Sequence, residues 1–156
     1  MMEIHSGPDG GSVTIFRPDG SEAPGSPLFG GGLVVPWAIS ADGNDHVWVS
    51  NFGNVTDGIV ELCGYRTETC PAGMKMGDQI SPPSGYVGGG LQLQVDIVIN
   101  AAGDVWVSNN WQDWQAGLER VQEARSTLAA GQGLVVFYGM AKPVRTPMIG
   151  PARPAE

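Results

Sequence analysis

The sequence predicts an all-β protein, a partial β-propeller, from its composition and from an internal repeat. The chain has 156 residues, of which 24 are glycine and 12 are proline, while charged residues make up only 15%. This composition is typical of many short strands joined by tight turns, and it is unfavourable for long helices. An all-β fold is therefore the starting expectation.

The repeat consists of two motifs that each occur twice. Gly-Gly-Gly-Leu at 30–33 recurs at 88–91, and Val-Trp-Val-Ser-Asn at 47–51 recurs at 105–109. Each second copy lies 58 positions after the first, from 30 to 88 and from 47 to 105. Two separate motifs that keep one spacing predict a structural repeat.

Each repeat has the order of elements that an antiparallel hairpin needs. An apolar run, at 37–39 or 95–99, precedes a turn rich in Asp, Asn and Gly at 42–45 or 100–104, and the Val-Trp-Val strand follows. Turn chemistry between two strand-like runs predicts a β-hairpin. We therefore expect Trp48 and Trp106, at the centre of the second strands, to pack between successive sheets.

A third strand is expected to complete each sheet, at 58–62 and at 133–137. A similar strand at 12–16 stands alone, which predicts the last strand of a preceding blade whose first two strands are missing from the chain. An insertion at 111–132 in the second unit is predicted to contain a short helix. The four prolines of the tail favour an extended, loosely attached segment.

The expected organisation has four parts. They are a terminal segment with the last strand of a truncated blade (1–29), a first blade unit with its connecting loop (30–87), a second unit with its insertion (88–138) and a Pro-rich tail (139–156). Closed propellers have roughly four to eight blades. About two blades and one strand predict a fragment of a larger protein or a chain that self-associates.

The segment 36–51, Pro-Trp-Ala-Ile-Ser-Ala-Asp-Gly-Asn-Asp-His-Val-Trp-Val-Ser-Asn, resembles the blade signature of NHL-repeat propellers and of streptogramin (virginiamycin B) lyase-like proteins. The resemblance spans about residues 12–138 and implies a propeller of about six or seven such blades. The lyase-like relatives use a metal, a histidine base and acidic ligands. Many of their blades place a Glu directly after the aromatic strand, where this chain has Asn51 and Asn109.

The charge balance limits the expected partners. With 8 Lys and Arg against 16 Asp and Glu, the formal net charge is -8, which would repel nucleic acid and anionic lipid. No stretch approaches the roughly 20 apolar residues that a transmembrane helix needs, and the first residues lack the pattern of a signal peptide. We expect neither nucleic-acid binding nor membrane insertion.

Cys63 and Cys70 enclose a short loop rich in Gly and Thr. A disulfide would close this loop in an oxidising compartment, and two free thiols are the alternative. A zinc site is not expected, because no second Cys/His pair completes four ligands. The cysteine spacing and the family resemblance together predict an extracellular or periplasmic location.

Candidate ligand-binding residues are Asn51, Asn109, Trp111, Asp113 and Trp114. The two tryptophans flank Gln112 and Asp113 at the start of the insertion, and flat rings beside amide and carboxylate groups suit a glycan or a peptide. The same tryptophans would also serve to anchor a long loop.

Other polar residues have plainer interpretations. His46 is interpreted as a solvated turn residue, because no orienting partner can be placed beside it, and His5 lies near the chain terminus. Asp42 and Asp45 could hold a cation, but a hairpin turn needs the same residue types. No catalytic residue, metal or cofactor is assigned.

The sequence therefore favours a non-catalytic propeller scaffold that binds a ligand or protein through loops on one face. Its expected partners are missing blades of the same protein or further copies of the chain. The alternative is a fragment of a metal-dependent lyase or hydrolase whose catalytic residues lie outside this chain.

Overall fold

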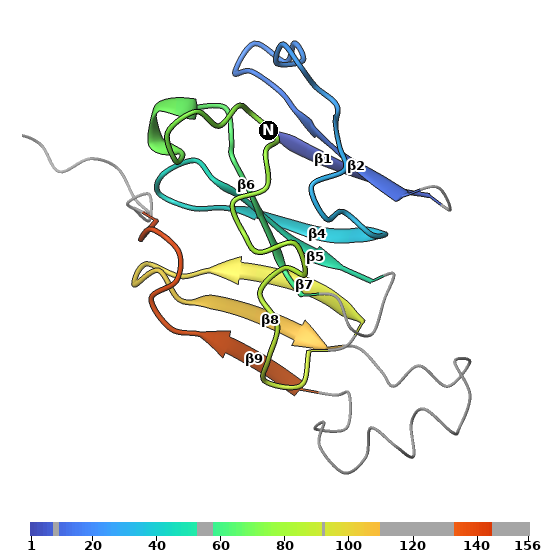
Figure 1. The fold of residues 1–156 in the computed structure, drawn as a ribbon, viewed down its shortest axis with the longest axis vertical. Helices are drawn as coiled ribbons and strands as arrows, with labels where there is room; N and C mark the ends of the chain where they lie inside the picture. The colour runs from blue at the N-terminus through green and yellow to red at the C-terminus, as the bar shows by residue number, and fades with distance from the viewer. Residues whose placement is uncertain (8–9, 53–57, 92, 110–132, 145–156) are drawn as a thin grey trace, which may run out of the picture.

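The computed structural model describes residues 1–7, 10–52, 58–91, 93–109 and 133–144. These residues form three antiparallel sheets of three strands each and one short 3₁₀ helix, η1 (Thr67–Thr69). The sheets follow one another along the longest axis of the molecule (Figure 1). The prediction of an all-β chain is confirmed. No helix among these residues has the length and apolar character that crossing a bilayer requires.

The first sheet differs from the expectation of one isolated strand. It contains β1 (Met2–Gly7), β2 (Gly10–Ile15) and β3 (Leu28–Phe29), with β2 in the middle. The predicted strand at 12–16 therefore overlaps a middle strand, and the prediction that its neighbours are missing is wrong. The alternation of apolar Met2 and Ile4 with polar Glu3 and His5 is the period-two pattern of a strand, and it explains β1.

The second and third sheets repeat one plan. Their strands are β4 (Pro36–Ala41), β5 (Val47–Asn51) and β6 (Val60–Leu62), then β7 (Gln94–Ile99), β8 (Val105–Asn109) and β9 (Gly133–Phe137). Ile39 pairs with Val49 as Ile97 pairs with Val107. Each ladder also shifts register near the start of its first strand, between 36 and 38 or between 94 and 96. The 58-residue repeat in the sequence is thus a repeat of strand geometry.

A hydrogen bond explains why the two sequence motifs keep their spacing. The side-chain amide of Asn51 donates to the carbonyl of Gly32 at 2.9 Å, and that of Asn109 donates to Gly90 at 2.8 Å. All three glycines at 30–32 and at 88–90 have positive φ, a conformation in which other residues are strained. The glycines and the asparagine therefore hold the backbone in one conformation just before the first strand of each sheet.

Two apolar layers hold the three sheets together. Between the first two sheets, Val13 and Leu28 pack with Val49 and Leu62. Between the second and third sheets, Trp48 and Ile59 join a layer with Val107 and other residues of the third sheet. Successive sheets therefore hide their facing sides against one another, while the two end faces have no such neighbour in the described part of the chain.

The start of the tail is attached more firmly than the sequence predicted. The amide of Ala141 donates to the carbonyl of Gly103, and the amide of Gly43 donates to the carbonyl of Lys142. Residues 141–142 thus join the hairpin turns of the second and third sheets. The tail beyond 144, and the insertion for which a short helix was predicted, lie outside the described residues.

Candidate functional site

The two predicted asparagines have structural roles in the described fold. Asn51 is fully buried, and its Oδ1 accepts a hydrogen bond from the amide of Val34 in addition to the bond that its Nδ2 donates to Gly32. Asn109 is half-buried and makes the equivalent bond in the third sheet. Asn51 therefore has no surface position, whereas Asn109 is partly exposed. Trp111, Asp113 and Trp114 lie outside the described residues.

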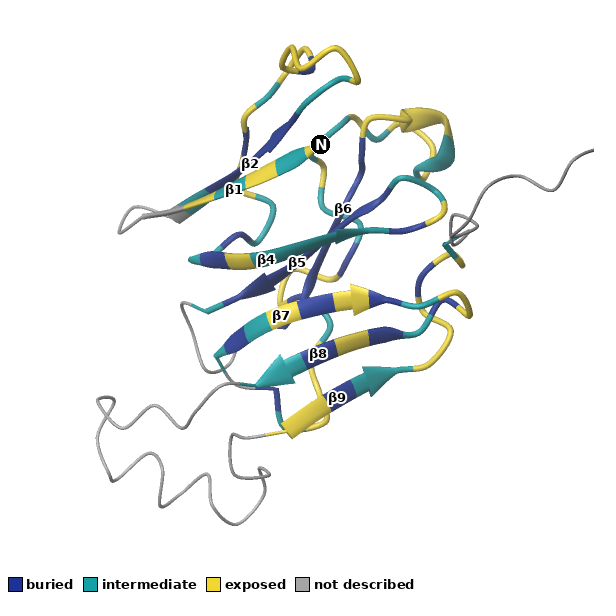
Figure 2. Ribbon diagram, turned by 180° about the vertical axis from the view of Figure 1, so that it is seen from behind, coloured by how far each residue is buried: buried dark blue, intermediate teal, exposed yellow. Residues whose placement is uncertain are grey.

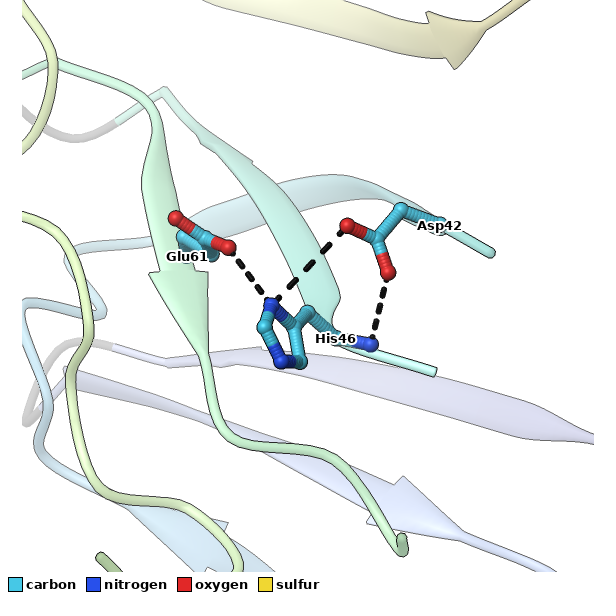
Figure 3. Close-up of side chains that lie close together, drawn as sticks. All are labelled: Asp42, His46 and Glu61. Atoms are coloured by element: carbon cyan, nitrogen blue, oxygen red, sulfur yellow. Dashed lines mark hydrogen bonds and ion pairs between the residues drawn. The ribbon is translucent and has the colours of Figure 1, made fainter. Parts of the chain in front are cut away.

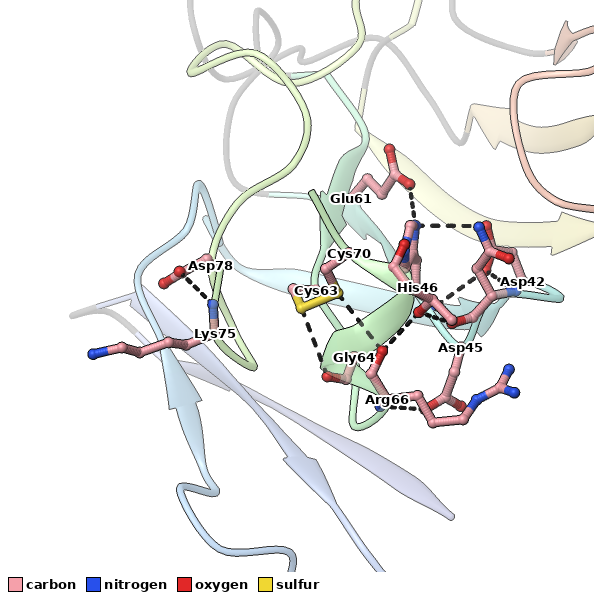
Figure 4. The surroundings of a disulfide bond; sticks show 12 residues. Asp42, Asp45, His46, Glu61, Cys63, Gly64, Arg66, Cys70, Lys75 and Asp78 are labelled. Atoms are coloured by element: carbon pink, nitrogen blue, oxygen red, sulfur yellow. Dashed lines mark hydrogen bonds and ion pairs between the residues drawn. A yellow bond between two sulfur atoms is a disulfide. The ribbon is translucent and has the colours of Figure 1, made fainter. Parts of the chain in front are cut away.

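The predicted disulfide is present. Cys63 and Cys70 are joined with a Cα to Cα distance of 5.7 Å, and their loop contains η1 (Figure 4). The loop leans over the turn between β4 and β5, because the amide of Arg66 donates to Asp45 and the hydroxyl of Thr69 donates to the carbonyl of Asn44. A disulfide indicates a non-reducing environment.

The turn beneath this loop is organised by Asp42. Its Oδ1 accepts hydrogen bonds from the amides of Asn44 and His46 at 2.8 and 3.0 Å, and the amide of Asp42 donates to the carbonyl of His46. An Asx side chain that bonds the backbone two residues on is the local device that closes such turns. The turn therefore places His46 immediately before β5.

His46 is buried rather than solvated, which corrects its interpretation as an exposed turn residue. Its Nδ1 lies 2.7 Å from Oε1 of Glu61 and 3.9 Å from Oδ2 of Asp42 (Figure 3). Its Nε2 lies 3.2 Å from the carbonyl oxygen of Thr69 in the disulfide loop. All three residues are 7% exposed. We call Asp42, His46 and Glu61 the buried triad.

Tyr86 extends the triad toward the third sheet. Its hydroxyl donates to Oε2 of Glu61 at 2.7 Å, and its ring stacks on Trp48 with centroids 5.5 Å apart. Burial, together with the adjacent Glu61 carboxylate, raises the pKa of Tyr86 well above its ordinary value. The phenol therefore stays protonated and remains a donor to Glu61.

One feature of the sequence indicates this triad. Glu61 is a single acid in the apolar strand Gly-Ile-Val-Glu-Leu, and a buried acid needs a partner. Its partner, His46, lies just before β5, so the two meet only in the register that aligns Trp48 of β5 with Glu61 of β6.

A separate pocket opens between the first two sheets. Its volume is about 400 Å³, within the range of small-molecule sites. Its wall is formed mostly by apolar residues such as Met2, Phe16 and Val47, with Arg17 and Asp45 among the polar ones. Of the residues predicted to bind a ligand, the two that the structure describes, Asn51 and Asn109, are not among those that line it.

Chemically, the buried triad offers one imidazole and two carboxylates in a small closed space, a set that can hold a proton or a cation. None of the three residues lines the pocket between the first two sheets, although the neighbouring Asp45 does. A comparison with protein-family models, with curated proteins and with solved structures finds no match for this chain.

Proposed function

We propose that this chain is a segment of an NHL-type or streptogramin lyase-like propeller and acts as a non-catalytic binding scaffold outside the reducing compartments of the cell. The serial packing of the first strands supports this proposal, since β1 contacts β4 and β4 contacts β7. Blades of a propeller are arranged in this way around their axis. The disulfide supports the extracellular or periplasmic location.

One observation carries the proposal of binding. Trp48 and Trp106 occupy the same position in the repeat, yet Trp48 is fully buried and Trp106 is 38% exposed. Trp48 is buried because the third sheet covers it. The equivalent face of the third sheet is apolar and open, so a further sheet can pack on it as the third packs on the second.

This open face contains several apolar side chains on adjacent strands. Val98 pairs with Trp106, and Trp106 pairs with Val136, while Leu134 lies two residues from Val136 on the same strand. Val98 and Leu134 are exposed. Exposed and buried segments lie side by side along β7, β8 and β9 (Figure 2). A contiguous apolar patch of this kind marks an interaction surface.

We propose that a second copy of the chain covers this open face in solution. The other end of the molecule presents Glu3 and His5, both more than half exposed, so a head-to-tail contact would place polar groups on the apolar face. Pairing two apolar faces about a two-fold axis avoids this cost. The dimer then buries Trp106 as the third sheet buries Trp48.

Sedimentation velocity of the purified, oxidised chain tests the proposal. We expect a dimer at micromolar concentration and a monomer for Trp106→Ser. Phe29→Ser is the matched control, because Phe29 is 73% exposed on the first sheet, away from the open face. A monomeric wild-type chain, or a dimer that Phe29→Ser disrupts and Trp106→Ser does not, would overturn the proposal.

A further inference from the structure

The hydrogen-bonding groups around His46 require one proton or metal ion more than a neutral imidazole beside two ionised carboxylates supplies. Nε2 faces the carbonyl of Thr69, which can only accept a hydrogen bond, so this nitrogen carries a hydrogen. Nδ1 faces carboxylate oxygens of Glu61 and Asp42, which when ionised are also acceptors. A neutral ring has one N–H and cannot serve both sides. Either a second proton or a metal ion must lie between Nδ1 and the carboxylates.

The charges of the triad lead to the same requirement. In the described part of the chain, the salt bridges of Asp42 and Glu61 both run to His46, and no Lys or Arg side chain joins them. Two buried carboxylates without a compensating cation are costly. A divalent ion would neutralise both and use the free lone pair of the ring.

We propose that the buried triad is a closed structural site for a divalent transition ion of the Zn²⁺ class. One ligand atom from each residue lies within 4.8 Å of the others, from the turn after β4, from the residue before β5 and from β6. Imidazole and carboxylate are ordinary ligands of Zn²⁺, and three protein ligands leave one tetrahedral position for a water molecule. Because all three residues are buried, the ion would stabilise the fold rather than act on a substrate.

The groups behind the ligands are those that usually orient metal ligands. A metal-binding histidine typically donates its other N–H to a carbonyl, as His46 does to Thr69, and ligating carboxylates are themselves hydrogen-bonded. Glu61 accepts from Tyr86, and Oδ2 of Asp42 accepts from the amide of Lys142. The disulfide holds the loop that contains Thr69, so it also holds the ring in place.

The third sheet shows that the fold does not need the triad. Asn100 closes the equivalent turn in the same way, because its Oδ1 accepts hydrogen bonds from the amides of Ala102 and Asp104. Asp104 stands in place of His46, and Val136, which pairs with Trp106, stands in place of Glu61. The histidine and the buried acid are therefore additions to a turn that forms without them.

The test is Zn²⁺ titration of the chelator-treated, oxidised protein by calorimetry, with thermal unfolding as the second readout. Oxidised protein is required because free thiols would bind zinc themselves. We expect one Zn²⁺ per chain, a raised midpoint of thermal unfolding, and no comparable effect of Ca²⁺. Glu61→Gln keeps the shape of the side chain and removes its charge, and it should weaken Zn²⁺ binding by more than about 100-fold, beyond the range seen for outer partners.

Matched controls locate the ion. His5→Gln removes the only other histidine of the chain, and Asp104→Asn alters the equivalent turn, so both variants should bind Zn²⁺ as the wild type does. Tyr86→Phe, which removes one hydrogen bond from Glu61, should weaken binding by about tenfold. Tyr86→Phe takes the place of Glu61→Gln as the test of the site if Glu61→Gln fails to fold.

Two outcomes would overturn the proposal. Folded wild-type protein that binds no Zn²⁺ would mean that His46 holds a second proton in place of a metal ion. Zn²⁺ binding that survives in folded Glu61→Gln, or that is unchanged in Tyr86→Phe when Glu61→Gln does not fold, would place the ion elsewhere.

Discussion

The second and third sheets share a sequence motif, a turn and a strand register, but they differ in what covers them. Val-Trp-Val-Ser-Asn is buried at all five positions in β5, whereas the tryptophan of β8 is exposed. Identical strand sequences thus have different environments because β5 has a sheet on each side, whereas β8 has a sheet on one side only among the residues that the structure describes. In a repeat protein, the burial of a residue is a property of its neighbouring unit as much as of its own.

The two hairpin turns differ in a second way. One acceptor oxygen, on Asp42 or on Asn100, closes each turn with the same hydrogen bonds. The remaining polar groups are thus free to differ. In the second sheet they form the buried triad, and in the third sheet the side-chain amide of Asn100 donates to Asp104 at 2.9 Å. The turn specifies the fold, and the variable groups around it are available for a site.

The largest effect should come from truncating the covered tryptophan. Trp48→Ala removes a fully buried ring from the layer between two sheets and should lower the free energy of unfolding by about 3–5 kcal/mol. Trp106→Ala removes a ring that is already partly in water and should cost about 1 kcal/mol or less. Urea unfolding followed by far-UV circular dichroism, at concentrations that keep the chain monomeric, measures both. Equal losses would show that the two sheets are covered alike.

Removing the disulfide should have the next largest effect on stability, and the effect should be confined to the second sheet. Replacing Cys63 and Cys70 with serine releases a short loop and should cost about 2–3 kcal/mol. Hydrogen exchange sharpens the comparison, because the amides of Asn44 and Ala102 make equivalent bonds in the two turns. We expect faster exchange at Asn44 and no change at Ala102. Equal acceleration at both amides would mean that the loop stabilises the whole molecule rather than one turn.

Replacing Asn51 in the second sheet should also destabilise the fold more than replacing Asn109 in the third. Asn51→Ala empties a fully buried position, leaves the amide of Val34 and the carbonyl of Gly32 without their side-chain partner, and should cost about 2 kcal/mol. Asn109→Ala acts in a half-buried position, where water can replace the lost bond to Gly90, and should cost about 1 kcal/mol. Thermal unfolding of both variants tests this order. A larger loss for Asn109→Ala would contradict the burial argument.

Sequence reasoning succeeded where the evidence is local. The hairpins, the third strands of both repeats and the pairing of Cys63 with Cys70 depend on turn residues, alternation and short spacing, and all are present in the structure. Strand β1 also had a local signal, since its apolar and polar residues alternate, but it lies outside the 58-residue repeat.

The site could not be predicted in the same way, because it depends on contacts between strands. His46 and Glu61 meet only when β5 and β6 are aligned and the disulfide loop is folded over the turn. Asn51 resembles a surface residue of a strand end by its type, yet its partners are backbone groups that precede β4. Residue type indicates what a side chain can bind, whereas its actual partner follows from the three-dimensional arrangement.

The smallest effect should come from making the two turns more alike. In Asn100→Asp the amide that donates to Asp104 becomes a carboxylate, which places two acids at the 2.9 Å separation of the present hydrogen bond. Repulsion between them raises the folded-state pKa of one acid above its unfolded value, so the protonated form is favoured in the folded protein. The variant should therefore lose about 1 kcal/mol at about pH 7, and the loss should shrink as the pH falls through that raised pKa, where a protonated acid can donate again. Urea unfolding at neutral and acidic pH decides the matter, because a loss that does not depend on pH would show that Asn100 acts through its shape rather than through its bond to Asp104.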